Sequence, residues 1–208
     1  MCVPTGVMME ACFHDAKGMK MKRHAMIAVL VLASMQAAHA QTVPAAAGQC
    51  PTSGKGSAEQ RARDIVMVGW ERNPGDGPLV FREKFARDYE WSDARDRLYY
   101  DDFSPNPRPV RDPDAYGAIW APIFSGLRSA RHAISIEPTA VYSGNLAVST
   151  LEFVALIEPA TGAARPIRTL MTLTWRCHAD GWRIIREHNS TKVVPADSIQ
   201  SYFKTAAR

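Results

Sequence analysis

The second half of the chain is a run of strand patterns separated by turn signals, and this order constrains the fold more than any other feature. Stretches rich in β-branched and aromatic residues follow one another after Ala133, divided by Gly, Asn, Pro and Asp-Gly signals. They are AISIEP, AVYSG, LAVSTLEFVALIEP, IRTLMTLTWRC and GWRIIREH. No helical pattern interrupts them, so the pattern predicts a mostly antiparallel sheet. Strands this long must curl, because sheets twist.

Helical patterns precede these strands. Ser57 and Gln60 form a capping box before the first apolar repeat, Pro78 suits the first turn of a second helix, and Asp112 caps a third. The strand pattern RLYYDDF lies between the second and third helices. Helices first and strands afterwards predict an α+β domain, a curved sheet wrapped around three N-terminal helices. An incompletely filled interior of such a cone would form a pocket.

The first part of the chain has the pattern of an export signal. Lys20, Lys22 and Arg23 precede the apolar run AMIAVLVLA, and AHA at 38–40 predicts cleavage after Ala40. The apolar run is shorter than the ~20 residues of a membrane span, so we predict a periplasmic or secreted protein with no membrane contact after cleavage. We interpret the segments as an over-extended start (1–18), a signal peptide (19–40), a flexible leader (41–56) and one domain (57–208).

Composition limits the partners. The chain has 25 Lys and Arg against 21 Asp and Glu, and its arginines are scattered, which does not indicate a nucleic-acid partner. Beyond the predicted cleavage site the cysteines are Cys50 and Cys177, and a pair in an exported chain favours a disulfide. Two unpaired thiols are the alternative. His132, His178 and His188 lack ligand spacing, so we predict no metal site and no cofactor.

Four stretches resemble the nuclear transport factor 2-like superfamily, and within it the SnoaL-like branch. They are YYDDF, RDPDAYGAIWAPIFSGL, GNLAVSTLEFVAL and TLTWRCHADGWRIIREHNS, and the last is also similar to the association domain of calmodulin-dependent kinase II. The resemblance covers residues 57–192 and implies a hydrophobic cone with few polar groups inside. It also implies a homodimer through the outer sheet face. Relatives include ketosteroid isomerase, scytalone dehydratase, limonene epoxide hydrolase and polyketide cyclases, so the fold alone does not determine the function.

The last strand pattern, at 181–190, begins apolar and ends in five polar side chains, which we interpret as the mouth of the pocket. Strict alternation puts Trp182, Ile184, Arg186 and His188 on one face, and the resemblance implies that this face points into the cone. Arg186 could then hold an anionic group but could not exchange protons. His188 is the preferred working residue, because a histidine changes charge near neutral pH. The alternative for His188 is a structural hydrogen bond at a strand end.

The first strand and the third helix supply further candidates. Asp101 and Asp102 must lie on opposite faces, so at most one carboxylate can face the pocket, where burial would favour work as a general base. We favour Asp102, with Tyr100 on the same face; a solvated pair of carboxylates is the alternative. Tyr116 and Trp120 are candidate ligand contacts on the third helix, with core packing as the alternative.

These observations leave several functions open. The first is an exported domain that binds a small apolar or weakly anionic ligand in its cone. The second is a cofactor-independent isomerase, dehydratase or cyclase-like enzyme that uses Asp102 or His188 for proton transfer. A weaker third possibility is an oligomerisation module. A dry cone without a buried carboxylate would exclude the enzyme, whereas a buried acid with a strongly shifted pKa would favour it.

Overall fold

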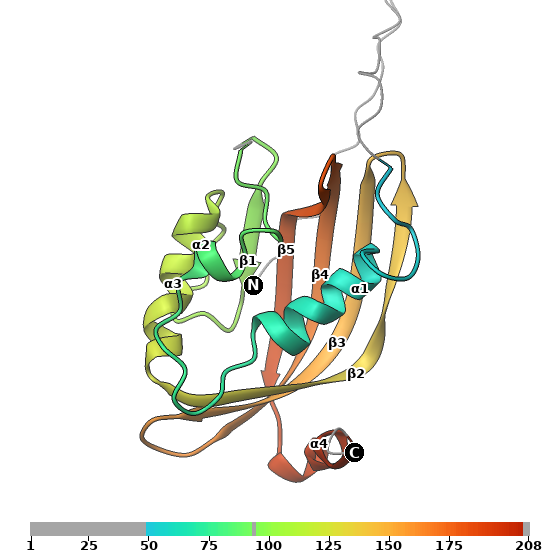
Figure 1. Ribbon diagram of the computed structural model, residues 1–208. Coiled ribbons are helices and arrows are strands. Elements are labelled where there is room, and N and C mark those ends of the chain that lie inside the picture. The colour runs from blue at the N-terminus through green and yellow to red at the C-terminus, as the bar shows by residue number, and fades with distance from the viewer. Residues whose placement is uncertain (1–48, 93–94, 206–208) are drawn as a thin grey trace, which may run out of the picture. The chain divides into compact units, whose positions relative to one another are not determined.

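The computed structural model describes residues 49–92 and 95–205, which lie within one compact unit, Thr42–Arg208 (Figure 1). The predicted start segment, the signal peptide and most of the leader lie outside the described residues. Within the described part of the chain, no helix is long and apolar enough to cross a membrane.

The described strands form one five-stranded sheet in the order β1-β5-β4-β3-β2. Neighbours from β2 to β5 are antiparallel, and β1 pairs with β5 in parallel. Figure 1 shows the long strands curving beneath the helices. The predicted α+β class and curved, mostly antiparallel sheet are therefore confirmed. The strands are β1 (Leu98–Asp101), β2 (Leu127–Ser143), β3 (Leu146–Pro159), β4 (Arg165–His178) and β5 (Gly181–Val193).

Two of the expected strands are one continuous strand. The AISIEP and AVYSG patterns both belong to β2, whose pairing with β3 shifts between Ile134 and Ile136 and again between Ile136 and Thr139. Pro138 lies inside the second irregularity. Proline cannot donate a ladder hydrogen bond, and a bulge accommodates it without ending the strand.

Three N-terminal helices cover the concave face of the sheet: α1 (Ala58–Asp64), which continues into the π-helical turn η1 (Ile65–Gly69), α2 (Phe81–Lys84) and α3 (Pro113–Ser125). The predicted caps are present, because the Ser57 side chain accepts from Gln60 N and the Asp112 side chain accepts from Asp114 N. Helix α2 is shorter than the sequence pattern predicts. Residues 88–90 instead pair with β5 through hydrogen bonds to the backbone of Ile184.

An aromatic cluster fills the space between these helices and β1, with ring centroids 4.8–6.4 Å apart. Its members are Trp70, Phe81, Phe85, Tyr89, Tyr99, Tyr116, Trp120 and Phe124. Gly117 permits the close packing of α3 on α2, because a Cβ at this position would lie 2.5 Å from the Phe81 side chain. Aromatic rings of this size dominate core energetics, so the cluster fixes the helices over the sheet.

The sequence did not predict the C-terminal elements η2 (Ala196–Ser198) and α4 (Gln200–Thr205). Ile199 is buried there against Ala133 and Val154. Side chains alternate along a strand, and the neighbours Phe153 and Ala155 belong to the main core, so Val154 faces the opposite side of the sheet. Helix α4 therefore covers part of the outer face, and Figure 1 shows it apart from the other helices.

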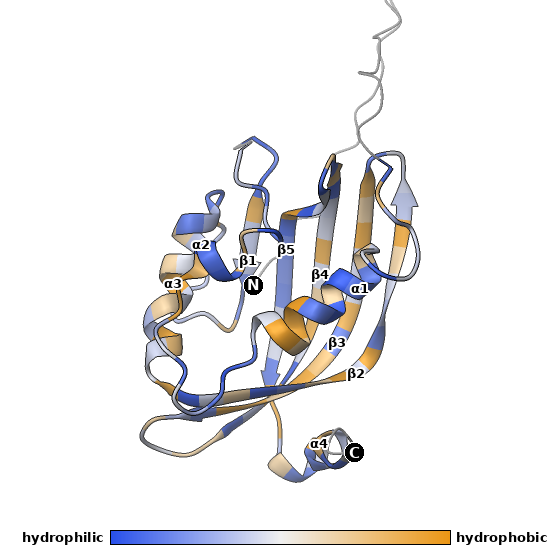
Figure 2. Ribbon diagram, viewed as in Figure 1, coloured by the Kyte–Doolittle hydropathy of each residue, from blue (hydrophilic) through white to orange (hydrophobic). Residues whose placement is uncertain are grey.

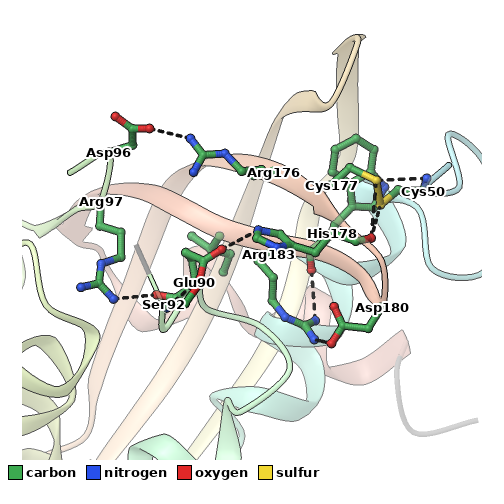
Figure 3. A network of polar contacts seen from close by, with 12 residues as sticks. Cys50, Glu90, Ser92, Asp96, Arg97, Arg176, Cys177, His178, Asp180 and Arg183 are labelled. Carbon is green, nitrogen blue, oxygen red and sulfur yellow. Dashed lines mark hydrogen bonds and ion pairs between the residues drawn. A yellow bond between two sulfur atoms is a disulfide. The ribbon is translucent and has the colours of Figure 1, made fainter. Parts of the chain in front are cut away.

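A disulfide joins Cys50 to Cys177, with Cα atoms 5.7 Å apart, and confirms the predicted pair. It ties the segment before α1 to the end of β4, where Trp182 Nε1 also donates to Pro51 O at 2.8 Å. Figure 3 shows polar contacts beside it, including His178 Nε2 at 2.5 Å from Glu90 Oε2. The closing hairpin is thus held at its turn end by covalent and polar contacts.

Candidate functional site

The polar end of β5 faces the interior through different residues from those predicted. Thr174 pairs with Arg186 but Trp175 pairs with Ile184, so Ile185 is an extra residue in the ladder. Such a bulge reverses the alternation beyond it. The residues of β5 that are buried on the inner side, with exposed fractions of 1%, 0%, 2% and 4%, are Trp182, Ile184, Glu187 and Asn189. Figure 2 shows β5 as hydrophilic over much of its length, although this part includes buried side chains.

The predicted orientation of Arg186 and His188 is therefore wrong. Both side chains are exposed and belong to the outer face of the sheet. The physical reason is the bulge at Ile185, which strict alternation ignores. The pocket-facing roles predicted for these two residues have no geometric basis in this strand.

Strand β1 follows β5 in parallel register, with Tyr100 opposite His188 and Asp101 opposite Asn189. Tyr100 consequently lies on the outer face, where its ring centroid is 5.5 Å from that of His188. Asp101 is 8% exposed and faces inward. The preference for Asp102 as the pocket carboxylate is wrong, because Asp102 Oδ1 instead accepts from Thr191 N at 2.8 Å.

A cavity of about 70 Å³ lies between α3 and the concave face of the sheet. Aromatic rings form much of its wall, namely Trp70, Phe103, Trp120, Phe124 and Phe153. Five polar residues reach it: Asp101, His132, Thr169, Asn189 and Thr191. Of the predicted ligand contacts on α3, Trp120 lines this cavity, whereas Tyr116 is buried beside it. The cavity therefore combines an apolar wall with a small set of titratable and hydrogen-bonding groups.

Two buried carboxylates are linked behind this wall. Asn189 Nδ2 donates to Asp101 Oδ2 at 2.8 Å and to Glu187 Oε1 at 2.7 Å. Glu187 also accepts from the Tyr89 hydroxyl at 2.5 Å and the Tyr116 hydroxyl at 2.9 Å. This chain of contacts, Asp101–Asn189–Glu187 with the two tyrosines, is called the carboxylate network below. None of these contacts involves a Lys or Arg side chain.

Burial dominates the electrostatics of the carboxylate network. It raises the pKa of Glu187 to about 7, against the opposing hydrogen bond from Tyr89, and the negative charge of Asp101 acts in the same direction as burial. Burial likewise raises the pKa of Asp101 to about 6, although Asn189 and the Phe103 N–H donate to this carboxylate. Asp101 is therefore a carboxylate that exchanges its proton close to neutral pH and borders an apolar cavity.

His132 is the functional candidate that the sequence analysis missed. It projects from β2 into the cavity, and its Nδ1 is 3.1 Å from Glu71 Oε2. The same carboxylate oxygen accepts from the backbone N–H of His132 at 3.0 Å, so two contacts fix the histidine. Glu71 lies 61 positions away in the sequence, and no local pattern indicates the pair. The only sequence signal was a histidine at the start of a long strand.

The arrangement can perform acid–base chemistry. Asp101 and His132 both border one cavity, and carboxyl and imidazole groups are common general acids and bases in enzymes. Within the described residues, no three His, Cys, Asp or Glu side chains are grouped so as to hold a metal ion.

No protein-family model and no curated protein sequence matches the chain. Solved structures do match it. A nuclear transport factor 2-like superfamily protein from Salmonella enterica is 13% identical, over 55% of this chain and 78% of that one, with a TM-score of 0.45. A hexachlorocyclohexane dehydrochlorinase from Novosphingobium barchaimii is 9% identical, over 65% and 84%, with a TM-score of 0.48.

A third match comes from Xanthomonas campestris and is proposed to be a calcium/calmodulin-dependent protein kinase II association domain. It is 13% identical over 72% of this chain and 94% of that one, with a TM-score of 0.48. These similarities concern the fold and not the activity of the chain. The matches among solved structures include nuclear transport factor 2-like proteins, the superfamily that four stretches of the sequence resemble.

Proposed function

We propose that the protein is a cofactor-independent enzyme that transfers protons on a small molecule bound in the cone, as an isomerase, a dehydratase or a related lyase does. One observation carries the proposal: the Asp101 carboxylate and the His132 ring, whose Nδ1 contacts Glu71, border the same apolar cavity. A domain that only holds an apolar ligand has no need of a buried carboxylate, which is costly to remove from water. Buried acids with raised pKa values are typical of catalytic sites.

Each group has a distinct role in this proposal. Asp101 is the general base, because its raised pKa of about 6 lets it accept a proton near neutral pH. His132 acts at Nε2 as the second acid or base, since Glu71 holds Nδ1. Asn189 is a positioning residue, because its amide orients the Asp101 carboxylate from 2.8 Å. Glu187 fixes Asn189 in turn.

Hydrogen–deuterium exchange into a bound carbon acid tests this proposal without knowledge of the natural substrate. Small ring hydroxyketones such as 2-hydroxycyclohexanone would be incubated with the protein in D₂O, and deuterium incorporation followed by NMR. We expect Asp101→Asn to slow protein-dependent exchange by about 100-fold or more, the usual contribution of a general base. His188→Asn is the matched control on the outer face and should leave the exchange rate unchanged. If ligands bind without any protein-dependent exchange, the enzyme proposal is wrong and the binding domain is the better account.

We also propose a homodimer formed through the outer face of the sheet. Val148 and Leu170 are 38% and 48% exposed on adjacent strands of this face, and the rings of Tyr100 and His188 lie on the same face. A second copy would cover these apolar side chains. Sedimentation of the wild type and of Leu170→Glu would test this, since the variant should shift the protein to monomer. A wild type that sediments as a monomer at every concentration would contradict the dimer.

We propose export as well. The Cys50–Cys177 disulfide supports it, because structural disulfides persist in oxidising compartments. Mass spectrometry of the protein recovered from the periplasm or medium of its own cells should give a chain that begins at Gln41. Recovery only from the cytoplasm with thiols at both cysteines would contradict export.

A further inference from the structure

The cavity has an unusual hydrogen-bonding deficit at Asn189. This side chain is 4% exposed, and both hydrogens of Nδ2 are used by Asp101 and Glu187. Its Oδ1 is buried and, among the described residues, has no hydrogen-bond partner. A buried acceptor left without a donor costs about 1–3 kcal/mol, and Asn189 borders the cavity. A residue of the cavity wall therefore carries a buried acceptor without a donor.

Most other polar groups of the cavity are also hydrogen-bond acceptors. The Asp101 side chain borders the cavity, and when it is ionised it can accept hydrogen bonds but cannot donate them. Donation from His132 Nδ1 to Glu71 leaves Nε2 of the neutral ring as an acceptor. Thr169 and Thr191 face each other with hydroxyl oxygens 2.9 Å apart and form one hydrogen bond between themselves, which leaves one hydroxyl hydrogen as a donor. The cavity thus offers mainly acceptors to a ligand.

One indole N–H belongs to the same wall. Trp120 lines the cavity, and its buried Nε1–H lies against the Tyr116 hydroxyl, where it opposes the rise that burial causes in the pKa of that tyrosine. A hydroxyl group on a ligand can donate to Asn189 Oδ1, whereas a carbonyl group can only accept. A ligand with a hydroxyl group therefore satisfies more of this wall than a ketone does.

The lining also carries no permanent positive charge within the described part of the chain. The side chains that border the cavity include no Lys or Arg within the described part of the chain, and Arg186 lies on the outer face. The negative charges of Asp101 and Glu187 lie within or just behind the wall. An anionic ligand would lose its hydration there without gaining a counter-charge. This argues against the weakly anionic ligand that the sequence analysis had allowed.

From these contacts we propose that the cavity selects a small apolar molecule that carries an O–H or N–H donor and no negative charge. The donor hydrogen-bonds to Asn189 Oδ1, and the apolar body packs among Trp70, Trp120 and Phe124. The inference names the ligand class for the site of the proposed function and rests on that site. One water needs about 10–15 Å³, so the cavity has room for about six water-sized atoms, the size of a single ring.

Equilibrium binding of four matched ring compounds tests the proposal on the wild-type protein. The probes are cyclohexanol (neutral donor), cyclohexylammonium (cationic donor), cyclohexanone (acceptor only) and cyclohexanecarboxylate (anion). Binding would be followed by Trp fluorescence, because Trp70 and Trp120 line the cavity, and by protein-observed NMR. We expect at least one donor to bind about tenfold or more tightly than cyclohexanone, as one rescued buried acceptor implies, with no detectable binding of the carboxylate. The relative affinities of cyclohexanol and cyclohexylammonium then show whether the cavity prefers a neutral or a charged donor.

Equal or tighter binding of the ketone or the carboxylate would overturn the proposal. Asn189→Leu supplies the second measurement, since it removes the acceptor and should reduce the alcohol-to-ketone preference to about one. His188→Leu, on the outer face of the same strand, should leave that preference intact. The ketone comparison uses wild-type protein, so its outcome does not depend on the folding of a variant. A donor preference without hydrogen–deuterium exchange would defeat the proposed enzyme alone and leave this inference standing.

Discussion

Replacement of Glu187 by Gln should change how the stability of the protein depends on pH. Burial raises the pKa of Glu187 from 4.5 to about 7, so the folded protein keeps this proton to a higher pH than the unfolded chain does. The corresponding stability is fully present below pH 4.5 and is lost as the pH rises through 7. The shift corresponds to about 3 kcal/mol of unfolding free energy.

Asp101 contributes in the same direction, because burial raises its pKa from 3.8 to about 6. The two carboxylates share Asn189 and repel each other when both are ionised, so their losses do not simply add. We therefore expect wild-type unfolding free energy to fall by about 3 kcal/mol or more between about pH 4.5 and pH 8. Ionised carboxylates without a cationic partner in the core are the physical cause.

The Glu187→Gln variant should separate the effect of Glu187 ionisation on stability from the effect of side-chain packing. Gln keeps the size of Glu but has one side-chain oxygen in place of two, so Tyr89 and Tyr116 can no longer both donate as they do to Glu187. The variant should lose about 1–2 kcal/mol at about pH 5, where wild-type Glu187 is protonated. At about pH 8 it should be the more stable protein by about 1–2 kcal/mol, because it cannot ionise.

Urea unfolding with the disulfide intact, measured from about pH 4.5 to 8.5, would show whether the two stability curves cross. His188→Gln serves as the control, since this exposed side chain should leave the slope unchanged. A wild type with equal stability at the two ends of this pH range would refute the reasoning. A Gln variant that retains the full wild-type slope would assign the slope to groups other than Glu187.

Three further perturbations test the packing of the fold. Replacement of both Cys50 and Cys177 by Ser should lower the unfolding free energy by about 4 kcal/mol, because the bridge spans 127 positions; urea unfolding should show this, and an unchanged midpoint would contradict it. Gly117→Ala should lower the unfolding free energy by about 1–3 kcal/mol, because the added Cβ would lie 2.5 Å from Phe81. A thermal midpoint equal to that of the wild type would show that α3 does not pack closely on α2. Ile199→Ala should lower the unfolding free energy by about 2–4 kcal/mol and speed hydrogen exchange of the α4 amides. Unchanged protection of the 200–205 amides would show that the Ile199 contact does not hold α4 in place.

The overall fold could be predicted because its signals are local. Apolar spacing and caps indicate the N-terminal helices, and turn residues separate the later strands. The limits of α2 could not be predicted in this way, because the residues after Phe85 pair with β5 in place of continuing the helix. Helix α4 was missed because its burial depends on Val154 and Ala133, which are distant in the sequence.

The site was harder to predict because one residue decides its orientation. Glu187 and Asn189 follow the bulge at Ile185, and strict alternation sends them to the wrong face. The adjacent apolar pair of Ile184 and Ile185 was the available signal, since alternation leaves one of them without a buried position. Both are buried, and the strand accommodates them by inserting one of them as an extra residue. The choice between the two aspartates then follows from the parallel pairing of β1 with β5, which sequence alone does not reveal.

Strand β1 brings Asp101 to the wall of an apolar cavity, the bulged strand β5 brings Glu187 just behind it, and the proposed chemistry depends on this pair of carboxylates without a cationic partner. Titration of the side-chain carboxyl carbons of Asp101 and Glu187 by ¹³C NMR measures their burial most directly. The structure predicts midpoints of about 6 and about 7 for the two carboxyl groups, because burial raises both pKa values. Midpoints of about 4 for both groups, the ordinary values of Asp and Glu, would show that these carboxylates are in contact with water and would contradict the buried site.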